Sequence, residues 1–398
     1  MYGLKRLVST ILLLIHTESL SAVLDPECDF AQEVVLGQEY YIYNPEYPNN
    51  RTSQKSCRWV GQSPPGTVIV ISCNDVSIPD SRDCQNYKLS FAPNGDPNFL
   101  DSADYCGSTT FTSYTEENSV AIGLFPSSGS QGRFLCTLAA MQVSSSCNCG
   151  LKRQMRIVGG HETGVNEFPP MAALMDVAKN DSFCGATIIS ERYALTASHC
   201  LLRQTADNLE LVVGDHDLST DQETNFSDRI PIIDFVQHPL YNINTQENDI
   251  AVVATSRRIL FNSAVGPVCL PFKYNSYNFL WEMVAALGWG FTDFSGNKAN
   301  TLQEADLYIV SNQDCDNALP ENIQTTQICT YADGRDACIS DSGGPLLWHD
   351  DYSGKLELVG IISFGLACAT DKPGVNTRVT AFLPWIVSVT SDNLYCIQ

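Results

Sequence analysis

A serine set between an acidic residue and two glycines is the feature of the sequence that most directly suggests chemistry. The segment reads Asp336-Ala337-Cys338-Ile339-Ser340-Asp341-Ser342-Gly343-Gly344-Pro345. Because glycines let the backbone fold tightly, the Ser342 hydroxyl can project while nearby backbone N–H groups point at a substrate oxygen. A serine hydroxyl needs a base beside it to act as a nucleophile. The segment therefore predicts nucleophilic catalysis and requires a histidine from elsewhere in the chain.

Two other segments place a histidine and an acid beside apolar runs. His199 follows the run that starts at Tyr193, and Asp249 directly precedes the run from Ile250. Taken singly, a structural histidine and a turn residue are the ordinary explanations. In combination with Ser342, His199 is the candidate base, and Asp249 would hold its tautomer and stabilise the imidazolium.

A site for proteolytic cleavage precedes these segments. Between Gln142 and Arg156 the chain has serines, two cysteines and a basic cluster but no apolar periodicity, so we expect an exposed linker that proteases cut. Directly after Arg156 comes the run Ile-Val-Gly-Gly from Ile157. Cleavage there would give Ile157 a charged amino group that could enter an apolar pocket, where a buried cation requires an acidic partner.

The order His199, Asp249, Ser342, with these local sequences, resembles the chymotrypsin-like serine peptidases across residues 157–398. The resemblance implies an all-β fold of two packed six-stranded antiparallel β-barrels, with the three residues in the cleft between them and a short C-terminal helix. Residues 381–390 carry apolar side chains at helical spacing and are expected to form that helix.

The same resemblance assigns roles in activation. Asp341 matches the acid that receives the new amino terminus of Ile157, which makes Arg156 the activation site of an inactive precursor. The enzyme that cuts there is expected to be a trypsin-like protease.

The resemblance also implies a substrate pocket. Asp336 occupies the base of the primary specificity pocket of trypsin-like members, where a carboxylate selects Arg or Lys, and Ala337 beside it favours Arg. Gly365 and Gly374 match the glycines that keep the pocket walls open, and Ser363 belongs to the strand that aligns the substrate backbone. A preference for aromatic residues is the alternative, but it would leave Asp336 unpaired.

One residue departs from the family pattern. Ser340 stands where relatives have the glycine whose N–H completes the oxyanion hole with that of Ser342, and strain there would cost on the order of 1–3 kcal/mol. The departure keeps open the alternative of a catalytically impaired homologue that acts as a binding or cofactor protein. It would also weaken the binding of protease inhibitors. A smaller departure is Asn376, where a tyrosine is common below the pocket.

Composition excludes several classes of partner. The chain has 398 residues and a formal net charge of −22, so we expect neither nucleic acid nor an anionic membrane surface as a partner. No cofactor is expected to be required. The loop at Asp215, His216 and Asp217 holds calcium in some relatives, but its ligand pattern is incomplete here, and no metal site is assigned.

The first 22 residues indicate export. Lys5 and Arg6 precede a short apolar run and then small residues, which is the pattern of a cleaved signal peptide rather than of a membrane anchor of about 20 apolar residues. The sixteen cysteines of a secreted chain then predict disulfides. Metal binding is the alternative, but the one tight pair, Cys147 and Cys149, has no histidine near it.

The first half of the chain resembles a CUB module at residues 28–136, a β-sandwich, and its ligand is unknown. Short β-type runs such as Thr67 to Ile71 fit that fold. By analogy Cys28 pairs with Cys57 and Cys84 with Cys106, which leaves Cys73 and Cys136 for an extra bond.

The protease resemblance implies further disulfides. The pairs are Cys184–Cys200, Cys315–Cys329 and Cys338–Cys368. Cys269 is expected to bond to Cys147 or Cys149, which would keep the N-terminal part attached after cleavage, and Cys396 is available for the other cysteine.

The whole order is a signal peptide at 1–22, a CUB domain at 28–136, a linker and activation segment at 137–156, and a protease domain at 157–398. This order resembles secreted serine proteases of insect saliva and venom, although a haemolymph cascade or a digestive role fits the same sequence. Expected partners are protein or peptide substrates with Arg or Lys at the cleaved bond. Asn50, Asn180 and Asn225 begin sequons for N-glycosylation.

Overall fold

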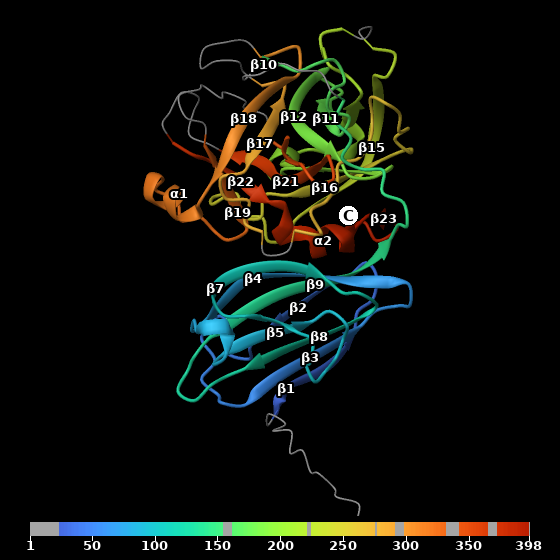
Figure 1. The fold of residues 1–398 in the computed structure, drawn as a ribbon. Helices are drawn as coiled ribbons and strands as arrows, with labels where there is room; N and C mark the ends of the chain where they lie inside the picture. Colours follow the sequence, from blue (N-terminus) through green and yellow to red (C-terminus); the bar gives the residue numbers. More distant parts are fainter. Residues whose placement is uncertain are drawn as a thin grey trace, which may run out of the picture.

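The computed structural model describes residues 24–153, 161–220, 224–274, 277–290, 298–331, 342–364 and 372–397. An N-terminal β-sandwich, blue to teal in Figure 1, lies beneath two β-barrels coloured green to red. The signal peptide proposed at residues 1–22 lies outside the described residues.

The sandwich is built from two sheets in which most neighbouring strands pair antiparallel. One sheet has the strand order β1-β3-β8-β5-β6, and the other has the order β2-β9-β4-β7. The strands are β1 (Leu24–Glu33), β2 (Glu39–Tyr43), β3 (Ser56–Gln62), β4 (Thr67–Ile78), β5 (Lys88–Ala92), β6 (Ala103–Tyr105), β7 (Gly107–Tyr114), β8 (Ser119–Phe125) and β9 (Arg133–Val143). Strands therefore extend beyond both ends of the expected range 28–136, because β1 starts before Cys28 and β9 continues to Val143.

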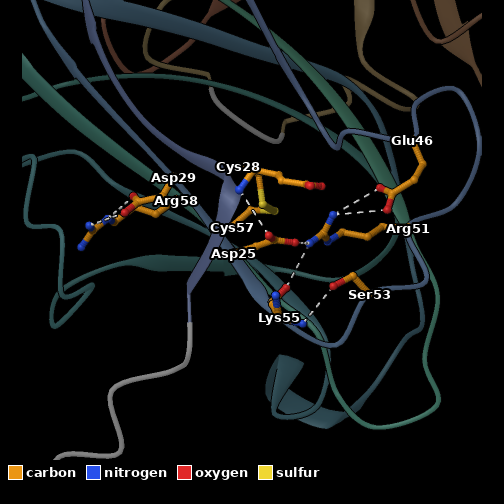
Figure 2. Close-up of a disulfide and its surroundings, with 10 residues drawn as sticks. Asp25, Cys28, Asp29, Glu46, Arg51, Ser53, Lys55, Cys57 and Arg58 are labelled. Carbon is orange, nitrogen blue, oxygen red and sulfur yellow. Dashed lines mark hydrogen bonds and ion pairs between the residues drawn. A yellow bond between two sulfur atoms is a disulfide. The ribbon is translucent and has the colours of Figure 1, made fainter.

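Disulfides and one buried cation fasten the sandwich. Cys28 is bonded to Cys57, Cys73 to Cys136 and Cys84 to Cys106. Near the first of these, Arg51 is 2% exposed and forms ion pairs with Asp25 and Glu46 (Figure 2). A buried cation is stable only with such partners. The pair with Asp25 also joins the start of β1 to the loop before β3.

The first barrel is closed by six strands in the order β11-β12-β13-β16-β15-β14. They are β11 (Met171–Asp176), β12 (Asp181–Ile188), β13 (Tyr193–Thr196), β14 (Leu209–Val213), β15 (Asp228–Gln237) and β16 (Ala251–Thr255). The apolar runs that precede His199 and follow Asp249 are β13 and β16, which pair antiparallel. This pairing brings the end of one run beside the start of the other.

The second barrel closes through the pairing of β18 with β19, in the order β18-β17-β20-β21-β22-β19, and β10 (His161–Glu162) adds to β18. Its strands are β17 (Met283–Gly288), β18 (Gln303–Val310), β19 (Gln327–Tyr331), β20 (Pro345–Asp350), β21 (Lys355–Phe364) and β22 (Gly374–Arg378). The two expected six-stranded barrels are thus confirmed.

The C-terminal helix is confirmed but is shorter than residues 381–390. A 3₁₀ turn, η4 (Val379–Phe382), leads into α2 (Leu383–Val389), with Pro384 in its first turn, where proline costs no hydrogen bond. A second helix, α1 (Asn312–Ala318), was not expected, and Ser311 caps it by accepting a hydrogen bond from the Asp314 N–H. No helix among the described residues is long and apolar enough to span a membrane.

Two disulfides join the linker to the barrels, and we call them the linker disulfides: Cys147–Cys396 and Cys149–Cys269. The second buries Cys149, and Gly150 lies against the Leu356 backbone. The expectation that the whole linker is exposed is therefore wrong at Cys149 and Gly150, because the bond between Cys149 and Cys269 holds them against the barrel surface. Residues 151–153 are exposed.

Candidate active site

A histidine and a buried aspartate form the centre of the candidate site. The Asp249 carboxylate is fully buried and accepts two hydrogen bonds from His199, from the backbone N–H at 2.9 Å and from ring Nδ1 at 2.7 Å. With its Nδ1–H directed at the carboxylate, the neutral imidazole keeps a lone pair on Nε2. His199 can therefore accept a proton at Nε2 while Asp249 fixes its tautomer.

Two hydroxyl groups from the second barrel hold Asp249 in place. The Ser363 hydroxyl at the end of β21 donates to Asp249 Oδ2. The Thr377 hydroxyl in β22 donates to the Asp249 backbone carbonyl at 2.7 Å. A buried carboxylate is tolerated only when its lone pairs are satisfied. Ser363 supplies one of these hydrogen bonds, and Thr377 holds the backbone of the same residue across the interface between the barrels.

The segment that carries His199 is fixed on both sides. His199 lies in a 3₁₀ turn, η2 (Ser198–Leu201), directly after β13. The Ser198 hydroxyl donates to the Ile250 carbonyl at 2.6 Å, and the Gln237 amide donates to the Ser198 carbonyl at 2.9 Å. The Cys184–Cys200 disulfide ties the turn to β12. The imidazole is partly exposed, so a substrate can reach it.

The Ser342 backbone docks onto the first barrel. Its carbonyl accepts a hydrogen bond from the Gly185 N–H at 2.9 Å, and the Gly343 N–H donates to Ile362 at 2.8 Å. Gly343 has a φ of +83°, and a side chain there would lie 2.2 Å from the Thr196 hydroxyl. Glycine is therefore required immediately after the candidate nucleophile, as its position in the motif suggested.

The Cys184–Cys200 disulfide lies beside the candidate base and the backbone of the candidate nucleophile. The Cys200 sulfur is 3.8 Å from His199 Nε2 and 3.6 Å from the Ser342 carbonyl oxygen. The potential ligand atoms of Cys184, His199 and Cys200 gather within 4.8 Å. Because the two sulfurs are bonded to each other, neither offers a metal ion a thiolate.

Two other histidines are buried and have structural surroundings. His238 packs against Phe382 and Trp385, and burial lowers its pKa to about 4. His216 is bonded through Nε2 to Glu162 at 3.0 Å. Neither has the aspartate pairing and partial exposure that mark His199.

The structure describes part of the expected substrate pocket. Gly374 lies in β22, where the nearest atom to an added Cβ would be the Thr330 hydroxyl at 3.4 Å. Asn376 is buried, and its amide donates to Thr330 at 3.0 Å. The remaining residues assigned to the pocket, oxyanion hole and activation lie outside the described residues: Arg156, Ile157, Asp336, Ser340, Asp341 and Gly365.

The other sites inferred from sequence are distributed over the surface and the two barrels. Cys315 is bonded to Cys329, whereas Cys338–Cys368 lies outside the described residues. The sequon residues Asn50, Asn180 and Asn225 are exposed. In the loop considered for calcium, Asp217 accepts two hydrogen bonds from Ser219, and these lower its pKa.

Comparison with known proteins assigns the family. The trypsin family model matches residues 157–386, and the CUB domain model matches residues 28–133. The chain belongs to the trypsin family of serine proteases. It is a serine endopeptidase with an N-terminal CUB domain, which confirms the two resemblances found in the sequence.

Similar proteins come from venoms and from a clotting system. Venom serine protease 34 of Apis mellifera is 39% identical over 386 residues, covering 95% of this chain and 92% of its own length. A venom serine protease of Polistes dominula is 42% identical over 255 residues, covering 63% of this chain and 91% of its own. The proclotting enzyme of Tachypleus tridentatus is 33% identical over 255 residues, covering 60% and 68%.

Sequence reasoning missed the supporting hydroxyl groups. Ser363 was expected to align the substrate backbone, but its hydroxyl also contacts Asp249, and Thr377 was not considered. Both are single hydroxyl residues within strands of the second barrel, Ser363 in β21 and Thr377 in β22. No local pattern distinguishes them, because their partner is more than a hundred residues away.

Proposed function

We propose that this trypsin-family protease uses Ser342 as nucleophile, His199 as general base and Asp249 to orient the histidine. The observation that carries the proposal is the buried Asp249 carboxylate, which holds both the backbone and the ring of His199. In this mechanism Nε2 of His199 takes the proton of the Ser342 hydroxyl as it attacks the peptide carbonyl, and then delivers it to the leaving amine.

Charge on the substrate oxygen is stabilised by backbone N–H groups. The N–H of Ser342 and that of Ser340 are the candidates for the oxyanion hole. Support comes from the docking of the Ser342 carbonyl onto Gly185, which fixes the backbone on one side of this group. The Asp249 carboxylate stabilises the imidazolium that forms.

Specificity and activation complete the proposal. Asp336 selects Arg or Lys beside the cleaved bond, and cleavage after Arg156 converts the precursor into the active enzyme when the Ile157 amino group pairs with Asp341. Exposure of residues 151–153 supports access of an activating protease to this part of the chain.

The enzyme is proposed to be secreted, as a component of venom or saliva. The signal-peptide pattern, the disulfides and the venom proteases among its relatives support export, with a venom or salivary role. The similarity to the proclotting enzyme favours a haemolymph cascade as the second candidate role. The source tissue of the transcript distinguishes the two roles.

The test is hydrolysis of matched Arg, Lys and Phe peptide substrates by the purified protein, before and after limited trypsin treatment. Cleavage after Arg should appear only after activation and should vanish in Ser342→Ala. An Arg156→Gln variant that becomes active on its own, or activity retained in Ser342→Ala, would refute the mechanism.

A catalytically impaired binding protein is the second candidate function, and the presence of Ser340 favours it. In that case the treated protein would carry a free Ile157 amino terminus and hydrolyse none of the three substrates. Restoring glycine with Ser340→Gly would then raise the rate, whereas Ser340→Ala would not.

A further inference from the structure

The outer face of one CUB sheet is covered by the protease. Along β4 and β9, alternate side chains face opposite sides of the sheet. Ile69 and Leu138 belong to the core of the sandwich, whereas Val70, Ala139 and Met141 belong to one apolar cluster with the protease core. Helix α2 contacts β4 and β9 directly, and Figure 1 shows it between the sandwich and the barrels.

Specific hydrogen bonds accompany this packing. Ser72 in β4 and Thr112 in β7 are cross-strand partners, and their hydroxyls donate to the same carbonyl, that of Thr380, at 2.8 and 2.9 Å. The Asn74 amide donates to the Ala381 carbonyl at 3.0 Å. Three side chains of the CUB domain thus bind two successive carbonyls of η4, and Ser72 is fully buried.

The CUB domain also contacts the loop that precedes β19. The Thr325 hydroxyl donates to the Asn74 carbonyl at 2.6 Å, and the Arg378 N–H donates to the neighbouring Thr326 carbonyl at 2.9 Å. Asn74 therefore contacts both strands of the antiparallel β19–β22 pair at the same end, since its carbonyl binds the loop that enters β19 and its amide binds η4, which follows β22.

The segment held in this way also supports the candidate active site. Three residues before Thr380, the Thr377 hydroxyl binds the Asp249 carbonyl. At the other end of β22 lies Gly374, assigned to the substrate pocket. A displacement of η4 would therefore move the strand that positions Asp249.

From these contacts we infer that the CUB domain is an intramolecular brace that positions Asp249 through β22. Ser72, Asn74 and Thr112 are positioning residues, since they act through Thr380 and Thr377 rather than on a substrate. The inference rests on the catalytic role proposed for Asp249. It makes the CUB domain part of the working enzyme, in addition to any ligand that its free surface binds.

The contacts between the CUB domain and the protease should persist after cleavage of the activation segment. Both linker disulfides lie on covalent paths between the CUB domain and the barrels. In addition, β23 (Leu394–Tyr395), from the C-terminal end of the protease, pairs parallel with the end of β9. A cut after Arg156 therefore leaves the two domains bonded and paired.

The test removes the two hydroxyls that share the Thr380 carbonyl, in the double variant Ser72→Ala/Thr112→Val. Ser90→Ala is the matched control, because Ser90 is also fully buried in the CUB domain but bonds Asp104 within the sheet that does not face the protease. Thr112→Ser retains the hydroxyl and should behave as wild type. Thr112→Val alone serves if the double variant is not secreted.

Two readouts are taken, one of them independent of activity. In the activated enzyme, kcat for an Arg peptide should fall about tenfold in the double variant, which corresponds to 1.4 kcal/mol in the barrier, and should stay within about twofold in Ser90→Ala. In the uncleaved protein, amide hydrogen exchange in residues 374–382 should be about tenfold faster in the double variant alone.

The outcomes separate the brace from the proposed function. An active wild type with an unchanged kcat in the double variant overturns the brace, whatever the loss in stability. If the activated wild type hydrolyses nothing, the proposed catalytic function fails, and the exchange measurement decides the brace alone. Unchanged exchange in residues 374–382 overturns it in either case.

Discussion

A buried carboxyl group outside the candidate active site should make the stability of this protein fall as pH rises. Glu357 lies in β21, is 2% exposed, and its Oε2 has no hydrogen-bond partner among the described residues. Burial, together with the nearby Asp350 carboxylate, raises its pKa to about 8, against the opposing effect of Lys273. Folded protein thus holds a proton on Glu357 at neutral pH.

The sign and size follow from the two pKa values. Below the ordinary value of 4.5, Glu357 is protonated in both the folded and unfolded states, and its stabilising contribution is complete. As pH rises towards about 8 the unfolded chain releases the proton while the folded protein retains it. The free energy of unfolding falls by about 1.4 kcal/mol per pH unit over this window, or roughly 5 kcal/mol in total.

Glu357→Gln tests this directly, because the amide has nearly the same shape and does not titrate. Urea-induced unfolding, with disulfides intact and followed by tryptophan fluorescence, would be measured at about pH 4.5, 6.5 and 8.5. The variant should gain stability relative to wild type as pH rises. Glu321 is exposed, so Glu321→Gln is the control for the loss of one negative charge. A difference between Glu357→Gln and wild type that is the same at all three pH values would refute the reasoning.

Three further predictions concern the active site, the CUB domain and the linker. Ser363→Ala removes a hydrogen bond to the buried Asp249 carboxylate, so kcat should fall about tenfold with little change in KM. A rise in KM as large as the fall in kcat would contradict a positioning role. Asp25→Asn should destabilise the CUB domain because the buried Arg51 loses one of its two carboxylate partners and keeps only Glu46. Since the hydrogen bond from Arg51 lowers the pKa of Asp25, this loss should be full above about pH 4 and fade in acid, and thermal melts across pH would check it. After cleavage at the activation site, variants lacking one linker disulfide should still migrate as one species on a non-reducing gel; two species from a single-disulfide variant would contradict the pairing.

Much of the fold and the chemistry could be predicted from local sequence. The serine motif, the histidine and the aspartate each sit in short segments whose residue types require a particular backbone, and Gly343 shows why. Its positive φ and its close approach to Thr196 leave no space for a side chain. Such requirements are local, so they can be recognised without knowing what packs against the segment.

Pairings between distant segments needed the tertiary structure. The sequence left Cys147 and Cys149 as alternatives for Cys269, because neighbouring cysteines reach the same partner equally well. The structure decides that Cys149 takes Cys269 and Cys147 takes Cys396. The site showed the same limit, since the Thr377 hydroxyl meets Asp249 only after both barrels close.

The sequence by itself determined the family and the class of enzyme, because the motifs that carry them are local, and it predicted a β-type run from Thr67 to Ile71. It did not determine what covers the faces of that strand. Alternation within β4 assigns Ile69 to the sandwich and Val70 to the protease, and only the docked structure shows that the cover is α2. The tendency to be buried is a property of one strand's composition, whereas the identity of the neighbour depends on how two surfaces far apart in the sequence meet.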